Sequence, residues 1–136
     1  FSFIAGVYYW YPKMTGKMMN EKLGIMHFVA TFITFNAAFY PMHNVGISGM
    51  PRRYATYDAS LTELNQFISI FAILFGLSQL IFVYNVFYSY KNGKEAGDNP
   101  WNGWSLEWAT SSPPPENSFI EIPTLLDAEE EAEKNE

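Results

Sequence analysis

The sequence predicts an all-α membrane protein that contains the end of one transmembrane helix and two complete transmembrane helices. Two windows, 23–51 and 64–90, contain no Asp, Glu, Lys or Arg. Each window is longer than the roughly 20 residues that an α-helix needs to cross the hydrocarbon core of a bilayer. A third apolar stretch, 1–11, is too short to cross on its own. We therefore assign residues 1–90 to the membrane part of the protein.

Residues 1–11, FSFIAGVYYWY, are predicted to be the last turns of a membrane helix. Its end is aromatic, as is typical of helices where they meet the lipid headgroups. Pro12 and Lys13 are expected to end the helix. The segment starts apolar, without a Met or a basic region, so it does not resemble a cleavable signal peptide, and we expect a further part of the helix upstream.

The first complete span is predicted at 23–48 and the second at 63–90. Gly, Ala and Thr recur along the first span, which suits close contact between helices in lipid. Pro41, near its far end, is expected to kink or end the helix. The second span begins with polar residues that include Asn65 and Gln66, and it ends among tyrosines typical of a membrane interface.

Beyond the second span, residues 91–126 are predicted to form a Trp- and Pro-rich extension that lies on the inner surface. The run Pro113–Pro115 favours an extended conformation. Residues 127–136 contain six acidic residues and one lysine, and thus most of the net charge of −6, so we predict a disordered tail there. The remaining charge is almost balanced, which argues against nucleic acid as a partner. Cysteine is absent, which excludes disulfides and thiolate metal sites.

The lysines predict the orientation of the spans. They lie before the first span and after the second, so two crossings return the chain to the same side: Lys13, Lys17, Lys22, Lys91 and Lys94. By the positive-inside rule this side, with the C-terminus, is the cytoplasm or the mitochondrial matrix. Arg52 and Arg53 then lie on the outer face, where they are the only basic residues.

The stretch GISGMPRRY presents Arg52 and Arg53 between the two spans. One interpretation is a solvated loop that happens to contain two charges. The other is a fixed anion site, because a guanidinium pairs with a carboxylate through two parallel hydrogen bonds. Gly46, Gly49 and Pro51 favour a tightly folded turn that would hold such a site. The residues alone leave both interpretations open.

Other polar residues of the first span predict structural contacts. His27 and His43 lie sixteen residues apart on one helix, so they do not share a metal ion unless the chain bends back. A histidine in a span usually faces the interior of a bundle, and we favour hydrogen bonding over ligation. Thr31, Thr34 and Asn36 are predicted to form hydrogen bonds between helices. No catalytic constellation is apparent, and we predict no catalytic residue and no metal ligand.

The ordered motifs YPKM-TG, FNxxFxPMH, GMPRRY, NPW, LEW and SPPP resemble the C-terminal part of subunit I of the aa3-type haem–copper cytochrome c oxidases. The resemblance covers nearly the whole chain except the acidic tail. It implies a bundle of twelve membrane helices, in which residues 1–11 end the tenth helix and the two complete spans are the eleventh and twelfth. That family has both termini on the inner side, in agreement with the lysines.

The resemblance also implies cofactors: haem a, haem a3 and the copper CuB. It assigns Arg52 and Arg53 to the propionates of both haems. The iron and copper ligands of the family lie upstream of this chain. Where some members bind a cation, Thr56 replaces a common Asp, so we do not predict that cation. Further residues are assigned to the surroundings of the low-spin haem: Phe39, Met42 and His27.

The implied function belongs to an assembled complex in the bacterial cell membrane or the mitochondrial inner membrane. The complex takes electrons from cytochrome c, reduces dioxygen to water and pumps protons. Expected partners are the N-terminal part of oxidase subunit I, subunits II and III, and the lipid bilayer. Two alternatives stay open: the same role in a quinol oxidase, and a purely structural membrane subunit that binds no haem. A natural split subunit and a piece of a longer chain are equally compatible with the sequence.

Overall fold

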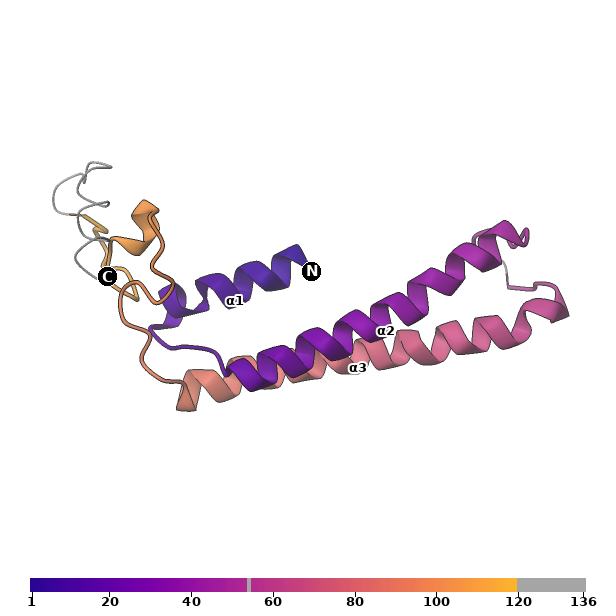
Figure 1. Cartoon of the computed structure of the whole chain (residues 1–136), viewed down its shortest axis with the longest axis horizontal. Helices are drawn as coiled ribbons and strands as arrows, with labels where there is room; N and C mark the ends of the chain where they lie inside the picture. Colours follow the sequence, from indigo (N-terminus) through magenta and orange to yellow (C-terminus); the bar gives the residue numbers. More distant parts are fainter. Residues whose placement is uncertain (54, 120–136) are drawn as a thin grey trace. The chain divides into compact units, whose positions relative to one another are not determined.

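The computed structural model describes residues 1–53 and 55–119. This part of the chain is helical and contains no β-strand, which confirms the all-α prediction. The elements in order are α1 (Ser2–Thr15), α2 (Glu21–Ile47), the 3-10 helix η1 (Ala59–Leu61), α3 (Thr62–Asn92) and the 3-10 helix η2 (Leu106–Trp108), as Figure 1 shows. The predicted acidic tail, 127–136, lies outside the described residues.

The chain divides into two compact units. The first consists of Phe1–Asn20 and the described residues from Val86 onward, and the second is Glu21–Asn85. In the second unit α2 and α3 run side by side (Figure 1). Each unit is considered separately below.

Helices α2 and α3 are both long and apolar enough to cross a membrane. At a rise of about 1.5 Å per residue, the 27 residues of α2 extend about 40 Å and the 31 residues of α3 about 46 Å, against a hydrocarbon core of about 30 Å. Helix α2 covers the predicted span 23–48 except for its last residue, and α3 covers 63–90 completely.

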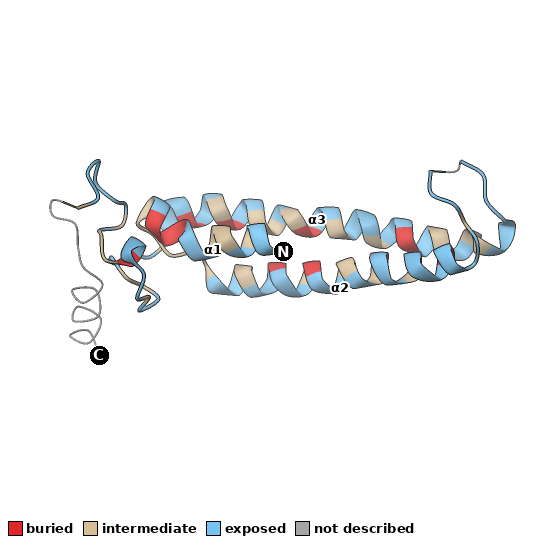
Figure 2. Ribbon diagram, turned by 90° about the horizontal axis from the view of Figure 1, so that it is seen from above, coloured by how far each residue is buried: buried red, intermediate tan, exposed pale blue. Residues whose placement is uncertain are grey.

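Most apolar side chains of these two helices are exposed, and Figure 2 shows only scattered buried positions along them. Helices that are apolar on all sides are typical of membrane spans. Where α2 meets α3, the buried residues are small, branched or polar rather than large: Ala38, Val45 and Ile68 lie there with Thr31 and Ser78. Close contact between two spans therefore depends on small residues and hydrogen bonds, as expected in lipid.

Neither proline ends its helix, and the expectation that Pro12 and Lys13 end the first helix is wrong. Helix α1 continues to Thr15 and stops at Gly16, which has a left-handed conformation (φ 70°) and donates its N–H to the carbonyl of Pro12 at 2.7 Å. Pro41 lies inside α2, which continues to Ile47. A proline removes one backbone hydrogen bond, and membrane helices tolerate this loss.

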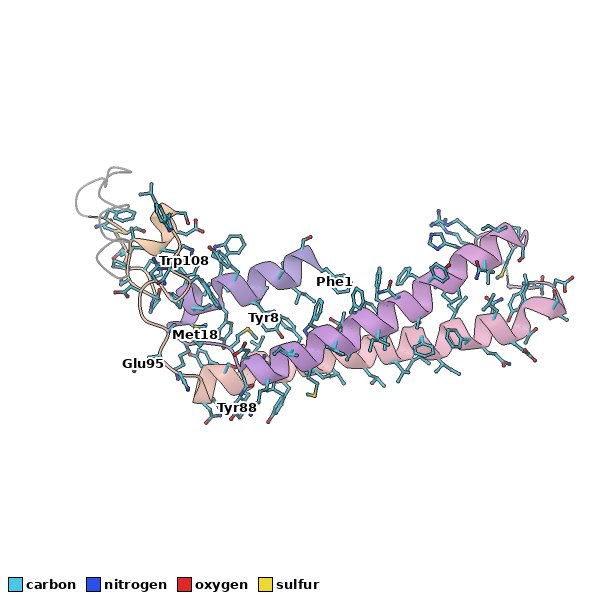
Figure 3. All side chains as sticks on the ribbon, in the orientation of Figure 1. Phe1, Tyr8, Met18, Tyr88, Glu95 and Trp108 are labelled. Atoms are coloured by element: carbon cyan, nitrogen blue, oxygen red, sulfur yellow. The ribbon has the colours of Figure 1, made fainter. Side chains whose placement is uncertain are left out.

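In the first unit, the connection after α1 pairs with the chain that leaves α3. The N–H of Met18 donates to the carbonyl of Lys94 at 2.8 Å, and the N–H of Ala96 donates to the carbonyl of Gly16 at 2.9 Å. Figure 3 labels Met18 and Glu95 in this region. The ammonium of Lys17 donates to the carbonyl of Tyr90 at 2.9 Å, near the end of α3. The lysine-containing segments before α2 and after α3 are thus close to one another.

The extension is held on α1 by Lys13, which is only 8% exposed. Its ammonium donates to the carbonyls of Thr110 (2.6 Å), Asp98 (3.2 Å) and Ser111 (3.4 Å) and lies 5.0 Å from the ring centre of Trp108. Burial lowers the pKa of Lys13, and the nearby Asp98 and Glu107 carboxylates oppose this effect. From the sequence, Lys13 indicates only a helix end and the orientation of the spans, and its contacts with the extension leave no signal there.

The tryptophans of the extension differ in burial. Trp108 is 2% exposed and donates its indole N–H to the hydroxyl of Tyr9 at 2.8 Å. Trp101 donates to the carbonyl of Tyr9 at 2.9 Å, while much of its ring stays exposed. Trp104 is also exposed. The extension packs on α1 through these contacts, and its position on the inner surface of the membrane stays a prediction.

Candidate functional site

The candidate site is the arginine loop, which we define as residues 50–53 and 55–58, between α2 and η1. At its start, a tight turn closes α2. Gly49 has a positive φ of 89°, its N–H donates to the carbonyl of Gly46 at 3.1 Å, and the N–H of Met50 donates to the carbonyl of Val45 at 3.2 Å. A positive φ favours glycine. The tight turn predicted from the glycines is confirmed.

The end of the loop is fixed by Asp58. Its carboxylate accepts the N–H of Ser60 at 2.8 Å, and its carbonyl accepts the N–H of Leu61 at 3.0 Å. These contacts cap η1, which leads directly into α3. The hydrogen bonds from Ser60 lower the pKa of the Asp58 carboxyl. The loop is therefore anchored at both ends.

A hollow of about 370 Å³ lies beside this loop, in the second unit. Its lining has two parts. The polar part consists of two guanidiniums and an amide, from Arg52, Arg53 and Asn65. The remaining lining is apolar or glycine: Met42, Val45, Gly46, Met50, Pro51 and Ile68. No acidic side chain is among the described lining residues. A ligand suited to this hollow has an anionic group and an apolar body.

Both arginines are exposed, and neither forms a hydrogen bond or ion pair with another described residue. The backbone of Arg53 is left-handed, with φ 64°. Residues other than glycine seldom adopt this conformation, and such backbones cluster at functional sites. Both guanidiniums are thus available to an anion from outside the described chain, and this chain alone does not bury them.

Two of the residues assigned to the surroundings of a haem have different positions relative to the hollow. Met42 lines it and is 41% exposed. Phe39 is 43% exposed, stacks on Phe35 with ring centres 4.5 Å apart, and is not among the lining residues.

His27 lies elsewhere on α2. At about 1.5 Å per residue, it is about 27 Å along the helix from Val45 of the hollow. It is 3% exposed, its Nε2 lies 3.3 Å from Oε1 of Gln79, and its ring lies beside Phe82. The structure therefore does not bring His27 into the hollow. The prediction that His27 forms a hydrogen bond is confirmed.

Gln79 is the centre of a hydrogen-bonded group between α2 and α3. Its amide donates to the hydroxyls of Thr31 (3.1 Å) and Ser78 (2.9 Å), which lie 3.1 Å apart. The prediction of interhelical bonding is confirmed for Thr31. Thr34 and Asn36 donate to carbonyls of α2 itself, because a carbonyl one turn back is available locally, and their bonding to other helices stays a prediction.

His43 bonds within α2 as well. Its Nδ1 lies 3.1 Å from the carbonyl of Phe39, and a carbonyl only accepts, so Nδ1 is the protonated nitrogen. Among the described residues, no group of three His, Cys, Asp or Glu side chains is arranged to hold a metal ion.

Comparison with known proteins identifies the family. The model of the family described as cytochrome C and quinol oxidase polypeptide I matches residues 1–76, more than half of the chain. The chain belongs to this family. Cytochrome c oxidase subunit 1 of Thermostichus vulcanus is 46% identical over 125 residues, and the subunits 1 of Corynebacterium diphtheriae and Corynebacterium efficiens are 50% and 51% identical over 129 residues. These matches cover 92% of this chain.

The chain spans 22–23% of the length of these oxidase subunits, and the matched segment is their C-terminal part. The resemblance inferred from the motifs is therefore confirmed at the level of the family. Together with the two apolar helices, membership of the oxidase family establishes a membrane protein. Asn65 is the polar residue of the site that the sequence did not identify. Its only signal was an amide at the start of an otherwise apolar span.

Proposed function

We propose that this chain is the C-terminal part of subunit I of an aa3-type cytochrome c oxidase, and that Arg52 and Arg53 bind the propionate carboxylates of haem a and haem a3. The observation that supports this most directly is the hollow beside the arginine loop, which combines two guanidiniums with an apolar lining. A porphyrin edge has the matching chemistry, because it presents carboxylates on an apolar body.

The residues present fit such a group. Two guanidiniums offer planar donor pairs that match two carboxylates. Neither guanidinium is already paired with a described carboxylate, so binding needs no internal ion pair to break. Met42 offers a polarisable apolar contact on the same hollow. Phe39 and His27 belong to this proposal as neighbours of the low-spin haem on α2, outside the hollow.

The arginines would act through charge and position. When bound, the haems supply electron transfer and, with CuB, the reduction of dioxygen. A unit positive charge at about 10 Å, in an effective dielectric of about 20, stabilises an added electron by on the order of 1–2 kcal/mol. Arg52 and Arg53 would thus raise the reduction potential of a haem that they hold and fix its carboxylates at the outer end of the bundle.

The complex that we propose takes electrons from cytochrome c, reduces dioxygen to water and pumps protons. The N-terminal part of subunit I, with subunits II and III, would complete it in a bacterial cell membrane or the mitochondrial inner membrane. The distribution of lysines supports a C-terminus on the cytoplasmic or matrix side. Helices α2 and α3 would close the bundle beside the low-spin haem.

The test is the substitution Arg52→Leu in the assembled oxidase, with both haems followed by redox titration. We expect one haem potential to fall by on the order of 40–90 mV, because 59 mV corresponds to a tenfold change for one electron. Arg52→Lys keeps the charge and should leave the potential closer to that of the unsubstituted enzyme. Unchanged potentials of both haems in Arg52→Leu would refute the electrostatic role.

Two other functions remain candidates. The exposure of both arginines in this chain favours a structural membrane subunit with a solvated loop, and the titration above separates it from the proposal. The family description includes quinol oxidases. Electron donation by cytochrome c or by quinol to the purified complex distinguishes these two enzymes.

A further inference from the structure

The position of the arginines depends on how the two ends of their loop are held. At the start, Met50 is tied to α2 through its own N–H, which donates to Val45. Only Pro51 separates Met50 from Arg52. Proline fixes its φ near −65°, so few torsions between Met50 and the first arginine are free to rotate. Displacement of Met50 would therefore displace the backbone from which the two arginine side chains extend.

The side chain of Asn65, in the first turns of α3, reaches Met50. Its Nδ2 lies 3.6 Å from the sulfur of Met50 and 2.9 Å from the carbonyl of Leu61. Both partners are acceptors only, so the amide nitrogen, not the oxygen, faces them. An amide has two N–H groups, and each has one of these acceptors. The bond to Leu61 holds the amide in the orientation that directs its second N–H at the sulfur.

Leu61 in turn belongs to the far anchor of the loop. Its N–H donates to the carbonyl of Asp58, while its own carbonyl accepts from Asn65. One amide therefore contacts Met50, where the arginine loop begins, and Leu61, the last residue of the 3-10 helix that follows the loop. Asn65 also lines the hollow beside the two guanidiniums.

We infer that Asn65 is the positioning residue of the arginine site: its amide ties the start of the loop to η1, through the sulfur of Met50 and the carbonyl of Leu61, and so positions the backbone from which Arg52 and Arg53 extend. This inference rests on the proposed function of the arginines. The role is indirect, because Asn65 has no charge with which to act on a haem.

The experiment uses three variants of the complete subunit in the assembled oxidase: Asn65→Leu, Met50→Leu and the double variant. Leucine approximates the size of both side chains and removes the donor or the sulfur. Hydrogen exchange of the amides of residues 50–61 reports the order of the loop, and redox titration reports the haems. Ser69→Ala is the matched control, because the Ser69 hydroxyl bonds only to the carbonyl of Asn65 on the exposed side of α3.

We expect Asn65→Leu to increase exchange in the loop several-fold and to lower the same haem potential as Arg52→Leu, by a smaller amount. Met50→Leu should act in the same direction and more weakly, since the bond to Leu61 survives. The double variant should match Asn65→Leu, because both substitutions remove one shared bond and their effects are then not additive. Ser69→Ala should change neither measurement.

Different results separate this inference from the proposed function. If Arg52→Leu shifts a potential while Asn65→Leu and Met50→Leu behave like Ser69→Ala, the positioning role is refuted and the arginine site stands. If Arg52→Leu leaves both potentials unchanged, the proposed function fails, whatever the exchange data show. Additive effects in the double variant would also refute the link between Asn65 and Met50. Should Asn65→Leu not assemble, Met50→Leu with its conserved volume decides the outcome.

Discussion

Substitution of Lys13 by Met should release the extension from α1. Methionine keeps an unbranched apolar side chain beside Trp108 and removes the ammonium that donates to three carbonyls of residues 98–111. A hydrogen bond to a charged group contributes about 1.5–3 kcal/mol, and a cation–π contact about 0.5–2 kcal/mol. Desolvation of the buried ammonium offsets several kcal/mol of this sum.

We therefore expect a net loss of about 2–4 kcal/mol in the local stability of the extension. The loss is limited because two of the three carbonyls belong to exposed residues, so water can replace the ammonium there. The assay is hydrogen exchange of residues 98–111 in the assembled protein, with limited proteolysis as a second measurement. At about 1.4 kcal/mol per tenfold change, exchange should accelerate on the order of 30-fold to 1,000-fold.

Lys94→Met is the matched control, because Lys94 has an exposed side chain. In Lys94→Met, hydrogen exchange of residues 98–111 should be as slow as in the unsubstituted protein. Equal exchange in Lys13→Met and Lys94→Met would refute the reasoning that the buried ammonium holds the extension.

The pH dependence of the same segment follows from the lowered pKa of Lys13. Between the folded pKa and the ordinary value of 10.5, the unfolded chain binds more protons than the folded one. Stability of the extension therefore rises with pH through this window, after correction for intrinsic exchange. Lys13→Met should abolish this rise.

Two further predictions concern the second unit. Gln79→Leu should destabilise the pair α2–α3 by about 1–3 kcal/mol, because it removes the amide at the centre of the interhelical hydrogen bonds. Thermal denaturation in detergent measures this loss. Gln66→Leu, at an exposed position, is the control and should have no effect. Asp58→Ala should increase exchange of residues 59–61 at neutral pH. Because the hydrogen bonds from Ser60 lower the pKa of Asp58, the stabilisation of η1 by this cap is lost in the unsubstituted protein as pH falls through the folded pKa. Asp58→Asn should keep the cap and lose this pH dependence.

The membrane helices were predictable because one physical constraint sets their length. A window without charged residues that exceeds the thickness of the bilayer identifies a span by composition alone, and α2 and α3 follow the two windows closely. The end of α1 was not predictable from Pro12. The stop depends on the left-handed backbone of Gly16, and the rule that proline breaks helices is weaker in membranes.

The parts of the sites that sequence analysis missed depend on contacts between distant residues. Lys13 bonds to carbonyls 85 to 98 residues further along the chain, and backbone carbonyls leave no signal in a sequence. Asn65 acquires its role from Met50, across the arginine loop. The arginines themselves were predictable, because two adjacent charges between apolar spans are conspicuous. Thr34 and Asn36 show the converse, since a local carbonyl competes with a distant partner.

The hydrogen bonds among Gln79, Thr31, Ser78 and His27 are all made within one pair of neighbouring spans joined by a short loop. These polar groups therefore have partners within the pair α2–α3, which lowers the cost of placing them in hydrocarbon. A bundle that contains this pair can accordingly be built from two neighbouring spans that already attract each other.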